Sequence, residues 1–239
     1  GPGAAPHLVV YSGKDMKVLV SQYVFDPRFL GGLNVTTGDV NADGISDIIL
    51  AADKGANPHV VVLSGDTFQV LASFYAYDKG FKGGLRVATA DVNGDGVLDI
   101  LTTTASGSIS HVVAFENLGQ NVLGSFYAFN QAVRNGVQIS SADLNGDGKS
   151  EILLGTTGGT DQQVGVYKGD PKAIDYFLAY PGWKGEVRVG SVKVGNLALI
   201  STGPGPGAGP DIRTFGPVRH ELIDSFFAGN PGDLSGVTL

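Results

Sequence analysis

The sequence contains no cysteine, and it has only one methionine and one tryptophan among its 239 residues. The absence of cysteine excludes disulfide bonds, thiolate metal sites and a cysteine nucleophile.

Basic residues are also scarce, and long apolar runs are missing. The chain carries 16 Lys and Arg against 23 Asp and Glu, a formal net charge of -7, and it has no cluster of Lys or Arg. Nucleic acids and anionic membranes bind basic surfaces, so we expect neither as a partner. No apolar run approaches the roughly 20 residues that a membrane-spanning helix needs. With 42% hydrophobic and 16% charged residues, the composition is that of a globular chain.

Helical periodicity is absent as well, and a long internal repeat takes its place. No segment shows a convincing 3.6-residue apolar period, so we expect helices to be scarce. Asp39, Asp91 and Asp143 lie 52 residues apart and open three related stretches, DVNADGISD, DVNGDGVLD and DLNGDGKSE. A repeat of this length is typical of arrays of small supersecondary units.

Each repeat contains four short runs of β-branched or aromatic residues, separated by turns rich in Gly, Asp, Asn and Pro. In the first repeat the runs are LNV from Leu33, IIL from Ile48, HVVVL from His59 and SFYAY from Ser73. Four antiparallel strands in a repeat of roughly 40–50 residues are the signature of a propeller blade. The sequence therefore predicts an all-β fold, a β-propeller with five blades of four antiparallel strands.

The two ends of the chain match parts of a blade. If they meet, they form a fifth blade shared between the N- and C-terminal segments, which closes the ring and removes exposed sheet edges. The second strand of that blade has no counterpart in the sequence, and six to eight blades are the alternative if the chain is a slice of a longer array. We expect a single domain over residues 1–239, divided into a half blade 1–31, blades 32–83, 84–135 and 136–184, a degenerate blade 185–235 and the start of a closing strand 236–239.

Ligand spacing identifies the type of loop in each repeat. Oxygen-bearing side chains at positions 1, 3 and 5, glycine at position 6 and a backbone carbonyl at position 7 are shared with the EF-hand. An EF-hand also needs a glutamate at position 12 and flanking helices, but position 12 is Leu50, Thr102 or Leu154 and the flanks read as strands. The acid falls at position 9 instead. We therefore interpret each stretch as a nine-residue hairpin loop between the first and second strands of a blade.

With these loops the sequence resembles the FG-GAP repeats of integrin α-subunit propellers and the related VCBS repeats of secreted bacterial proteins, whose loops read D-x-[DN]-x-[DN]-G-x-x-[DE]. The resemblance covers nearly the whole chain and implies three structural Ca²⁺ sites with hard oxygen ligands. Asp, Asn and Gly also form ordinary turns, but a turn does not need an acid at position 9 three times. The implied ligands are Asp39, Asn41, Asp43, Asp47 and the carbonyl of Ile45 in the first site, Asp91, Asn93, Asp95, Asp99 and the carbonyl of Val97 in the second, and Asp143, Asn145, Asp147, Glu151 and the carbonyl of Lys149 in the third.

Other candidate residues follow the repeat. His7, His59 and His111 occupy matching positions on successive blades, so we expect them to be spread around the ring without a shared metal site. No nucleophile–base pattern stands out. An apolar or aromatic residue, Trp183 in the third blade, recurs between one blade and the next and is expected to pack the blade interface. Its alternative role is stacking on a sugar, which makes Trp183 the candidate ligand-binding residue.

These observations favour a calcium-stabilised extracellular module for binding or adhesion. It would recognise a glycan or an extracellular protein through loops on one propeller face, in a lectin-like manner, at an extracellular, cell-surface or periplasmic location. Two alternatives stay open: a polysaccharide lyase or glycosidase with its site at the channel mouth, and a structural scaffold segment of a larger surface protein. The enzyme needs non-repeating polar residues at the axis, and fold analogy alone does not choose between these functions.

Overall fold

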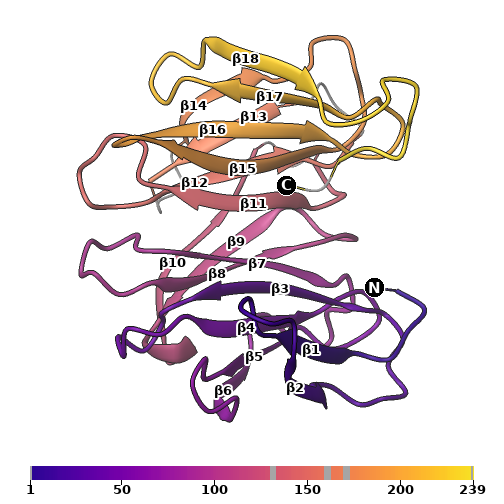
Figure 1. The fold of residues 1–239 in the computed structure, drawn as a ribbon, viewed down its shortest axis with the longest axis vertical. Coiled ribbons are helices and arrows are strands. Elements are labelled where there is room, and N and C mark those ends of the chain that lie inside the picture. The colour runs from indigo at the N-terminus through magenta and orange to yellow at the C-terminus, as the bar shows by residue number, and fades with distance from the viewer. Residues whose placement is uncertain (1, 130–132, 159–162, 169–172, 238) are drawn as a thin grey trace.

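The computed structural model of the chain consists mainly of short antiparallel strands (Figure 1). It describes residues 2–129, 133–158, 163–168, 173–237 and 239. Within these residues the one helical element is the short turn η1 (Asn117–Gly119), and no helix is long and apolar enough to cross a membrane. The prediction of an all-β fold with few helices is confirmed.

The strands form one two-stranded sheet and four four-stranded sheets, each hydrogen-bonded in chain order. The two-stranded sheet, called the N-terminal hairpin, contains β1 (His7–Tyr11) and β2 (Val18–Tyr23). Blade 1 contains β3 (Leu33–Gly38), β4 (Asp47–Ala52), β5 (His59–Leu63) and β6 (Val70–Tyr75). Blade 2 contains β7 (Leu85–Ala90), β8 (Asp99–Thr104), β9 (His111–Glu116) and β10 (Asn121–Tyr127). Blade 3 contains β11 (Val137–Ala142), β12 (Glu151–Thr156), β13 (Gln163–Tyr167) and β14 (Ala173–Leu178). Blade 4 contains β15 (Val187–Val194), β16 (Leu197–Pro204), β17 (Asp211–Phe215) and β18 (Leu222–Phe227).

The second strands of blades 1 to 3 are buried along their whole length. Strand β4, for example, contributes to the core shared with the N-terminal hairpin and to the core shared with blade 2. Because neither face of such a strand meets water, its sequence shows no alternation of apolar and polar residues, and β4 reads IILAA after Asp47. The outermost strand β6 alternates between exposed and half-buried residues, since one of its faces meets solvent.

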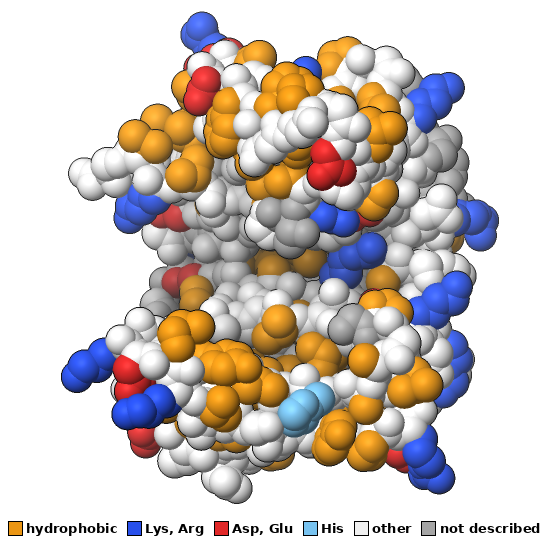
Figure 2. Space-filling model, turned by 45° about the vertical axis from the view of Figure 1, so that its right-hand side comes forward, with side chains coloured by type: hydrophobic (Ala, Val, Ile, Leu, Met, Phe, Trp, Pro, Cys, Tyr) orange, Lys and Arg blue, Asp and Glu red, His pale blue; other side chains and the backbone are white. Residues whose placement is uncertain are grey.

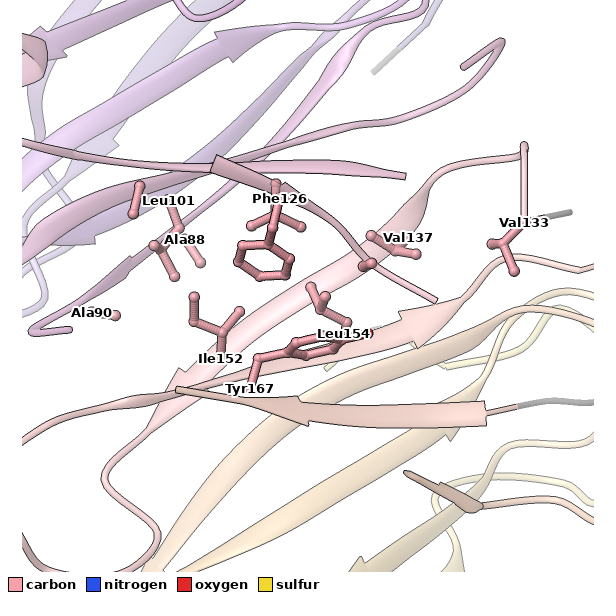
Figure 3. Close-up of a cluster of buried hydrophobic side chains, with 12 residues drawn as sticks. Ala88, Ala90, Leu101, Phe126, Val133, Val137, Ile152, Leu154 and Tyr167 are labelled. Atoms are coloured by element: carbon pink, nitrogen blue, oxygen red, sulfur yellow. The ribbon is translucent and has the colours of Figure 1, made fainter. Parts of the chain in front are cut away.

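Successive blades pack face to face through apolar cores. Figure 3 shows the core between blades 2 and 3, where the rings of Phe126 and Tyr167 lie 5.1 Å apart. The Tyr167 hydroxyl accepts a hydrogen bond from the Phe129 N–H at 2.9 Å and shares another with the Tyr176 hydroxyl at 2.9 Å, so its polar end is satisfied. Equivalent ring pairs join the other blades: Phe74–Phe115 at 5.1 Å and Phe177–Phe215 at 4.9 Å.

The first strands β3, β7, β11 and β15 lie next to one another, as Figure 1 shows from the lower to the upper part of the molecule. A ladder of side-chain hydroxyl groups joins them. Thr89 donates to the Thr37 carbonyl at 3.0 Å, Ser141 donates to the Thr89 carbonyl at 2.6 Å, and Ser191 donates to the Ser141 carbonyl at 3.2 Å. One sequence position therefore sets the spacing between all four blades.

The two ends of the described chain pack on different blades. The N-terminal hairpin places Leu8 and Val10 against blade 1. Gly236, Val237 and Leu239 lie against blade 4, where the Val237 N–H donates to the Pro204 carbonyl at 2.9 Å. Strand β1 pairs only with β2 among the described strands. The sheets are therefore not joined into a closed ring, because no described strand occupies the second-strand place between these two segments.

The interblade cores predict a large effect for one buried leucine. We expect Leu154→Ala to lower the free energy of unfolding by about 2–5 kcal/mol, because the Leu154 side chain is fully buried between blades 2 and 3 and its truncation leaves a cavity. Leu222→Ala on the exposed strand β18 is the matched control, with an expected change below about 0.5 kcal/mol. Urea unfolding followed by circular dichroism measures both. Equal effects of the two substitutions would contradict the interblade packing.

Candidate functional site

Three nine-residue loops join the first and second strands of blades 1, 2 and 3. We call residues 39–47 loop 1, residues 91–99 loop 2 and residues 143–151 loop 3. Each loop begins directly after the first strand, and its last residue is the first residue of the second strand. All the predicted ligand residues therefore lie on hairpins of the expected kind, one set for each blade.

The loops share one internal hydrogen-bond pattern, which loop 2 illustrates. Asp91 Oδ2 accepts from the Gly96 N–H at 2.9 Å, Asn93 Oδ1 accepts from the Asp95 N–H at 2.9 Å, and Asp95 Oδ1 accepts from the Val97 N–H at 2.8 Å. Gly96 has a φ of 86°, a conformation that residues with a side chain rarely adopt. Loops 1 and 3 repeat these bonds. The side chains at positions 1, 3 and 5 are therefore folded back over the loop.

The acid at position 9 is buried in every loop: Asp47 is 0% exposed, Asp99 3% and Glu151 3%. Each accepts a hydrogen bond from the N–H at position 2 of its own loop, at 3.2, 3.0 and 2.8 Å respectively. None of the ion pairs among the described residues includes any of the three. Each loop thus buries a carboxyl group that has amide partners and no paired cation.

The surroundings of these acids change their pKa values. Burial raises the pKa of Asp47 and of Glu151, and neighbouring acids of the same loop add to the rise. The pKa of Asp99 rises to about 6, first because of burial and then because of the negative charges of Asp95, Asp91 and Glu116. The buried acid of each loop therefore carries a charge that is poorly compensated, and a cation would be stabilised beside it.

The chemistry of the donors matches a hard divalent cation. Each loop offers three carboxylates and one amide oxygen from its side chains, together with the backbone carbonyl at position 7, and Ca²⁺ prefers such oxygen ligands. No three acidic or histidine side chains in the described part of the chain form a preassembled metal cluster. The fit therefore rests on the kind and order of the donors in each loop.

Backbone hydrogen bonds link the loops to one another. The Leu98 N–H of loop 2 donates to the Asp39 carbonyl of loop 1 at 3.2 Å, and the Ser150 N–H of loop 3 donates to the Asp91 carbonyl of loop 2 at 2.7 Å. The first residue of one loop thus holds the eighth residue of the next. Sequence reasoning missed this row, because a backbone contact between separate repeats leaves no mark on residue identity.

Blade 4 lacks such a loop. Strands β15 and β16 are longer than the first and second strands of blades 1 to 3, and their pairing continues to Val194 and Leu197. A two-residue turn with Gly195 at a φ of 61° joins them. Two basic residues of this blade, Arg188 and Arg213, form ion pairs with Glu186 and Asp211 at 3.3 and 2.9 Å rather than a shared patch.

Three cavities lie between successive blades at equivalent places. Their volumes are about 340, 410 and 460 Å³. A ring from the end of one blade borders each of them: Phe25, Tyr77 or Tyr180. The Tyr77 hydroxyl donates to the His111 carbonyl of the next blade at 2.9 Å, and the Tyr180 hydroxyl donates to the Asp211 carbonyl at 2.7 Å. The two tyrosines therefore hold neighbouring blades together while they line the cavities.

Trp183 lines the largest of these three cavities. Its ring packs edge to face with Tyr180 at 5.9 Å, and it is half-buried against the core between blades 3 and 4. The Arg213 guanidinium lies 4.6 Å above the Tyr180 ring in the same cavity. Trp183 thus combines contact with the core and contact with a cavity that contains polar groups.

The three matching histidines are not brought together. Each pairs with a serine of its own sheet: His7 with Ser21 at 3.0 Å, His59 with Ser73 at 2.8 Å and His111 with Ser125 at 2.8 Å. Burial lowers the pKa of His59 and of His111. The spread of the histidines over successive sheets agrees with their origin as repeat copies.

Polar side chains also meet where the first strands of the four blades come together, around a cavity of about 410 Å³. Asn34 donates to the Leu85 carbonyl at 2.7 Å, and Arg188 donates to the Val237 carbonyl at 2.6 Å. Arg86 donates to the carbonyls of Ala105 and Val137 at 3.1 and 3.4 Å. Asn34, Arg86 and Arg188 thus bond the backbone of a neighbouring blade or strand, and Asp53, Gln138 and Glu186 complete the polar lining of the cavity.

Basic side chains do not form a broad patch on the face shown in Figure 2, where most of them lie around the outline. The same view shows the molecule hollowed between its upper and lower parts. The arrangement agrees with the acidic balance of the sequence, which gave no basic footprint for phosphate groups.

Comparison with known proteins identifies the repeats. The family model described as FG-GAP-like repeat matches residues 39–102, and the model described as FG-GAP repeat matches residues 83–125 and 135–169, so together they cover about half of the chain. The solved structure described as the Dos1 propeller is 13% identical over 94% of this chain and 55% of that chain, with a TM-score of 0.57. An exotype rhamnogalacturonan lyase, YesX, is 15% identical over 96% of this chain and 47% of that chain, with a TM-score of 0.49. The chain spans about half the length of these two solved structures, and the first likeness supports the propeller fold.

The raised pKa of Asp99 predicts a pH-dependent effect of Asp99→Asn in metal-free protein. The folded state holds the Asp99 proton up to about pH 6, whereas the unfolded state loses it near pH 4. The stabilisation from this proton is therefore complete below about pH 4 and is lost as the pH rises through about 6. We expect the asparagine variant, which carries no charge, to be more stable than the parent by roughly 1–3 kcal/mol at pH 7.5 in EDTA.

At about pH 4 the two proteins are expected to have similar stability. Urea unfolding at both pH values in EDTA measures the difference. A stability gap that is the same at the two pH values would contradict the assigned burial of the charge.

Proposed function

The chain belongs to the FG-GAP repeat family, and on that basis we propose that it is a calcium-stabilised extracellular binding module. In this proposal loops 1, 2 and 3 each hold one Ca²⁺, and the propeller recognises a glycan or an extracellular protein. An extracellular, cell-surface or periplasmic location is part of the proposal. Repeats of this family are generally of the extracellular type, and the absence of cysteine leaves the fold without disulfide bonds.

The observation that carries the calcium role is the buried, cation-free acid at position 9 of each loop. Asp47, Asp99 and Glu151 each begin a second strand inside the propeller, and each loop brings two further carboxylates of positions 1 and 5 to the same hairpin. A bound Ca²⁺ would supply the positive charge that these groups lack. The hydrogen bonds within each loop would orient the ligands. Asp91, for example, accepts hydrogen bonds from loop amides, which fix the direction of its carboxylate oxygens.

The binding role is supported by the cavities between the blades. They join aromatic walls to a few polar groups, which is the usual make-up of sites for small ligands and sugars. The cavity at Trp183 places Tyr180, Asp211, Arg213 and Phe227 beside the indole ring. Aromatic faces and an ion pair in one cavity favour a ligand with both apolar faces and hydroxyl groups, so we assign the glycan site to this place.

The enzyme alternative receives less support. It requires non-repeating polar residues with free functional groups at the axis, but Asn34, Arg86 and Arg188 bond backbone carbonyls there. A scaffold role remains the outcome if no ligand binds.

Removal of calcium is expected to destabilise the fold. Three filled sites at 100 times their Kd would each contribute about 2.7 kcal/mol, and about 1 kcal/mol shifts the Tm of a domain of this size by roughly 2–4 °C. We therefore expect EDTA to lower the Tm by roughly 15–30 °C at pH 7.5, with full recovery in excess CaCl₂ and poor recovery in equimolar MgCl₂. Differential scanning calorimetry measures the shift. A melt that EDTA leaves unchanged would contradict the calcium role.

Substitution of Trp183 separates packing from ligand binding. We expect Trp183→Ala to abolish binding on a glycan array while Trp183→Phe, which keeps an aromatic face, retains part of it. Both variants are first checked for an unchanged thermal melt in calcium. If Trp183→Ala unfolds the protein and Trp183→Phe binds like the parent, the residue is a packing residue and the assigned site is wrong.

A further inference from the structure

One repeat position beside the loops carries a different charge in each blade. The residue that ends or follows the third strand is Ser64 in blade 1, Glu116 in blade 2 and Lys168 in blade 3. In blade 1 the next residue along, Gly65, donates its N–H to Asp47 Oδ1 of loop 1 at 3.1 Å. This chain segment therefore passes directly beside the acid at position 9 of loop 1, and the neutral, acidic and basic residues at this position accompany three otherwise similar loops.

Glu116 adds a negative charge to loop 2. Its Oε2 accepts a hydrogen bond from Asn93 at 3.4 Å, and its Oε1 accepts one from Asn121 at 3.1 Å. The side chain lines the same cavity as Asp95 and Asp99. Because Glu116 is half-buried, solvent and salt screen its charge only in part.

Lys168 has the opposite effect on loop 3. Its ammonium group lies 3.8 Å from Asp147 Oδ2, an oxygen of a predicted ligand. A bound cation would have to share Asp147 with this ammonium or displace it. Both side chains are about half exposed, 53% for Lys168 and 46% for Asp147, so this effect is open to screening by salt.

Ser64 leaves loop 1 without an added charge. Its hydroxyl accepts from the N–H groups of Asp66 and Thr67 at 3.3 and 3.2 Å, so it is engaged in its own turn. One further cation lies near the loops: the side chain of Lys149, from loop 3, passes over Gly94 of loop 2. The charge of Lys149 opposes that of Glu116 at loop 2, and Lys149 is the same in every variant compared below.

We propose that the residue after the third strand sets the calcium affinity of the adjacent loop, so that loop 2 fills first, loop 1 second and loop 3 last. The inference rests on the proposed calcium role and goes beyond it, since the family motif treats the three loops alike. A single added charge at a distance of several ångströms in a partly solvated site changes cation affinity by about 3–10-fold. Of the three blades with loops, blade 3 is therefore the last to be stabilised by calcium.

The three loops carry their own reporters for the test. The amide groups of Gly44, Gly96 and Gly148 donate to the first aspartate of loops 1, 2 and 3 at 2.8, 2.9 and 3.0 Å. Titration of the intact, calcium-free chain with CaCl₂, followed by ¹H–¹⁵N NMR of these three glycines, gives one midpoint for each loop in one sample. We expect the Gly96 signal to reach its midpoint at the lowest calcium concentration and the Gly148 signal at the highest.

Replacement of both charged residues by glutamine gives matched variants. Glu116→Gln keeps the hydrogen-bonding groups and is expected to weaken loop 2 by about 3–10-fold, with little change in loops 1 and 3. Lys168→Gln is expected to strengthen loop 3 by a similar factor, and this gain should shrink in 0.5 M KCl. The converse pair, Ser64→Glu and Ser64→Lys, is expected to strengthen and weaken loop 1.

The outcomes separate the inference from the calcium role. If no glycine signal responds to calcium, the calcium role itself fails. If all three respond with the same midpoint, or if the variants leave the order unchanged, the loops bind calcium but the residue after the third strand does not rank them, and the inference is overturned.

Discussion

No sheet of this protein has a core of its own, and the burial of each sheet depends on the next. Strand β4 is covered only because the N-terminal hairpin lies on one side and blade 2 on the other. The same holds for β8 and β12, whose residues are all buried. Stability is therefore built from contacts between neighbours, as in other repeat proteins. The ring pairs such as Phe126 and Tyr167, the hydroxyl ladder through Thr89 and the inner side chains such as Arg86 all act at these contacts.

The dependence of each sheet on its neighbours also explains where the loops lie and why each loop buries a charged group. A hairpin that leads from an inner first strand into a fully buried second strand must end on a buried residue, and that residue is an acid three times. The site thus places charge at the edge of the apolar core, where water compensates it poorly. The amide groups of the loop compensate part of this charge. The uncompensated part raises the pKa of Asp99. In the proposed calcium role, ion binding and blade packing would depend on the same three buried acids.

Much of the fold could be predicted because the same types of residue recur at matching positions of each repeat. Asp39, Asp91 and Asp143 recur at one interval, and Gly96 with its equivalents marks a backbone conformation that few other residues adopt. Strand order and loop position follow from these signals. The bond from the Leu98 N–H to the Asp39 carbonyl could not be predicted, since any residue can make it. The approach of Glu116 to Asn93 was likewise invisible, because it depends on where the third strand ends in space beside the loop.

Blade 4, which has a two-residue turn where blades 1 to 3 have a loop, is linked to its neighbour differently from the other blades. Loops 1, 2 and 3 hold one another through the carbonyls of Asp39 and Asp91, and in the described residues no such bond continues from loop 3 to the turn at Gly195. Blade 4 is held by its apolar face and by contacts such as that of Ser191. Its last strand, β18, is exposed at every residue. Under thermal fluctuation or pulling force, blade 4 is thus expected to open before the other four-stranded blades, which the loops link to one another.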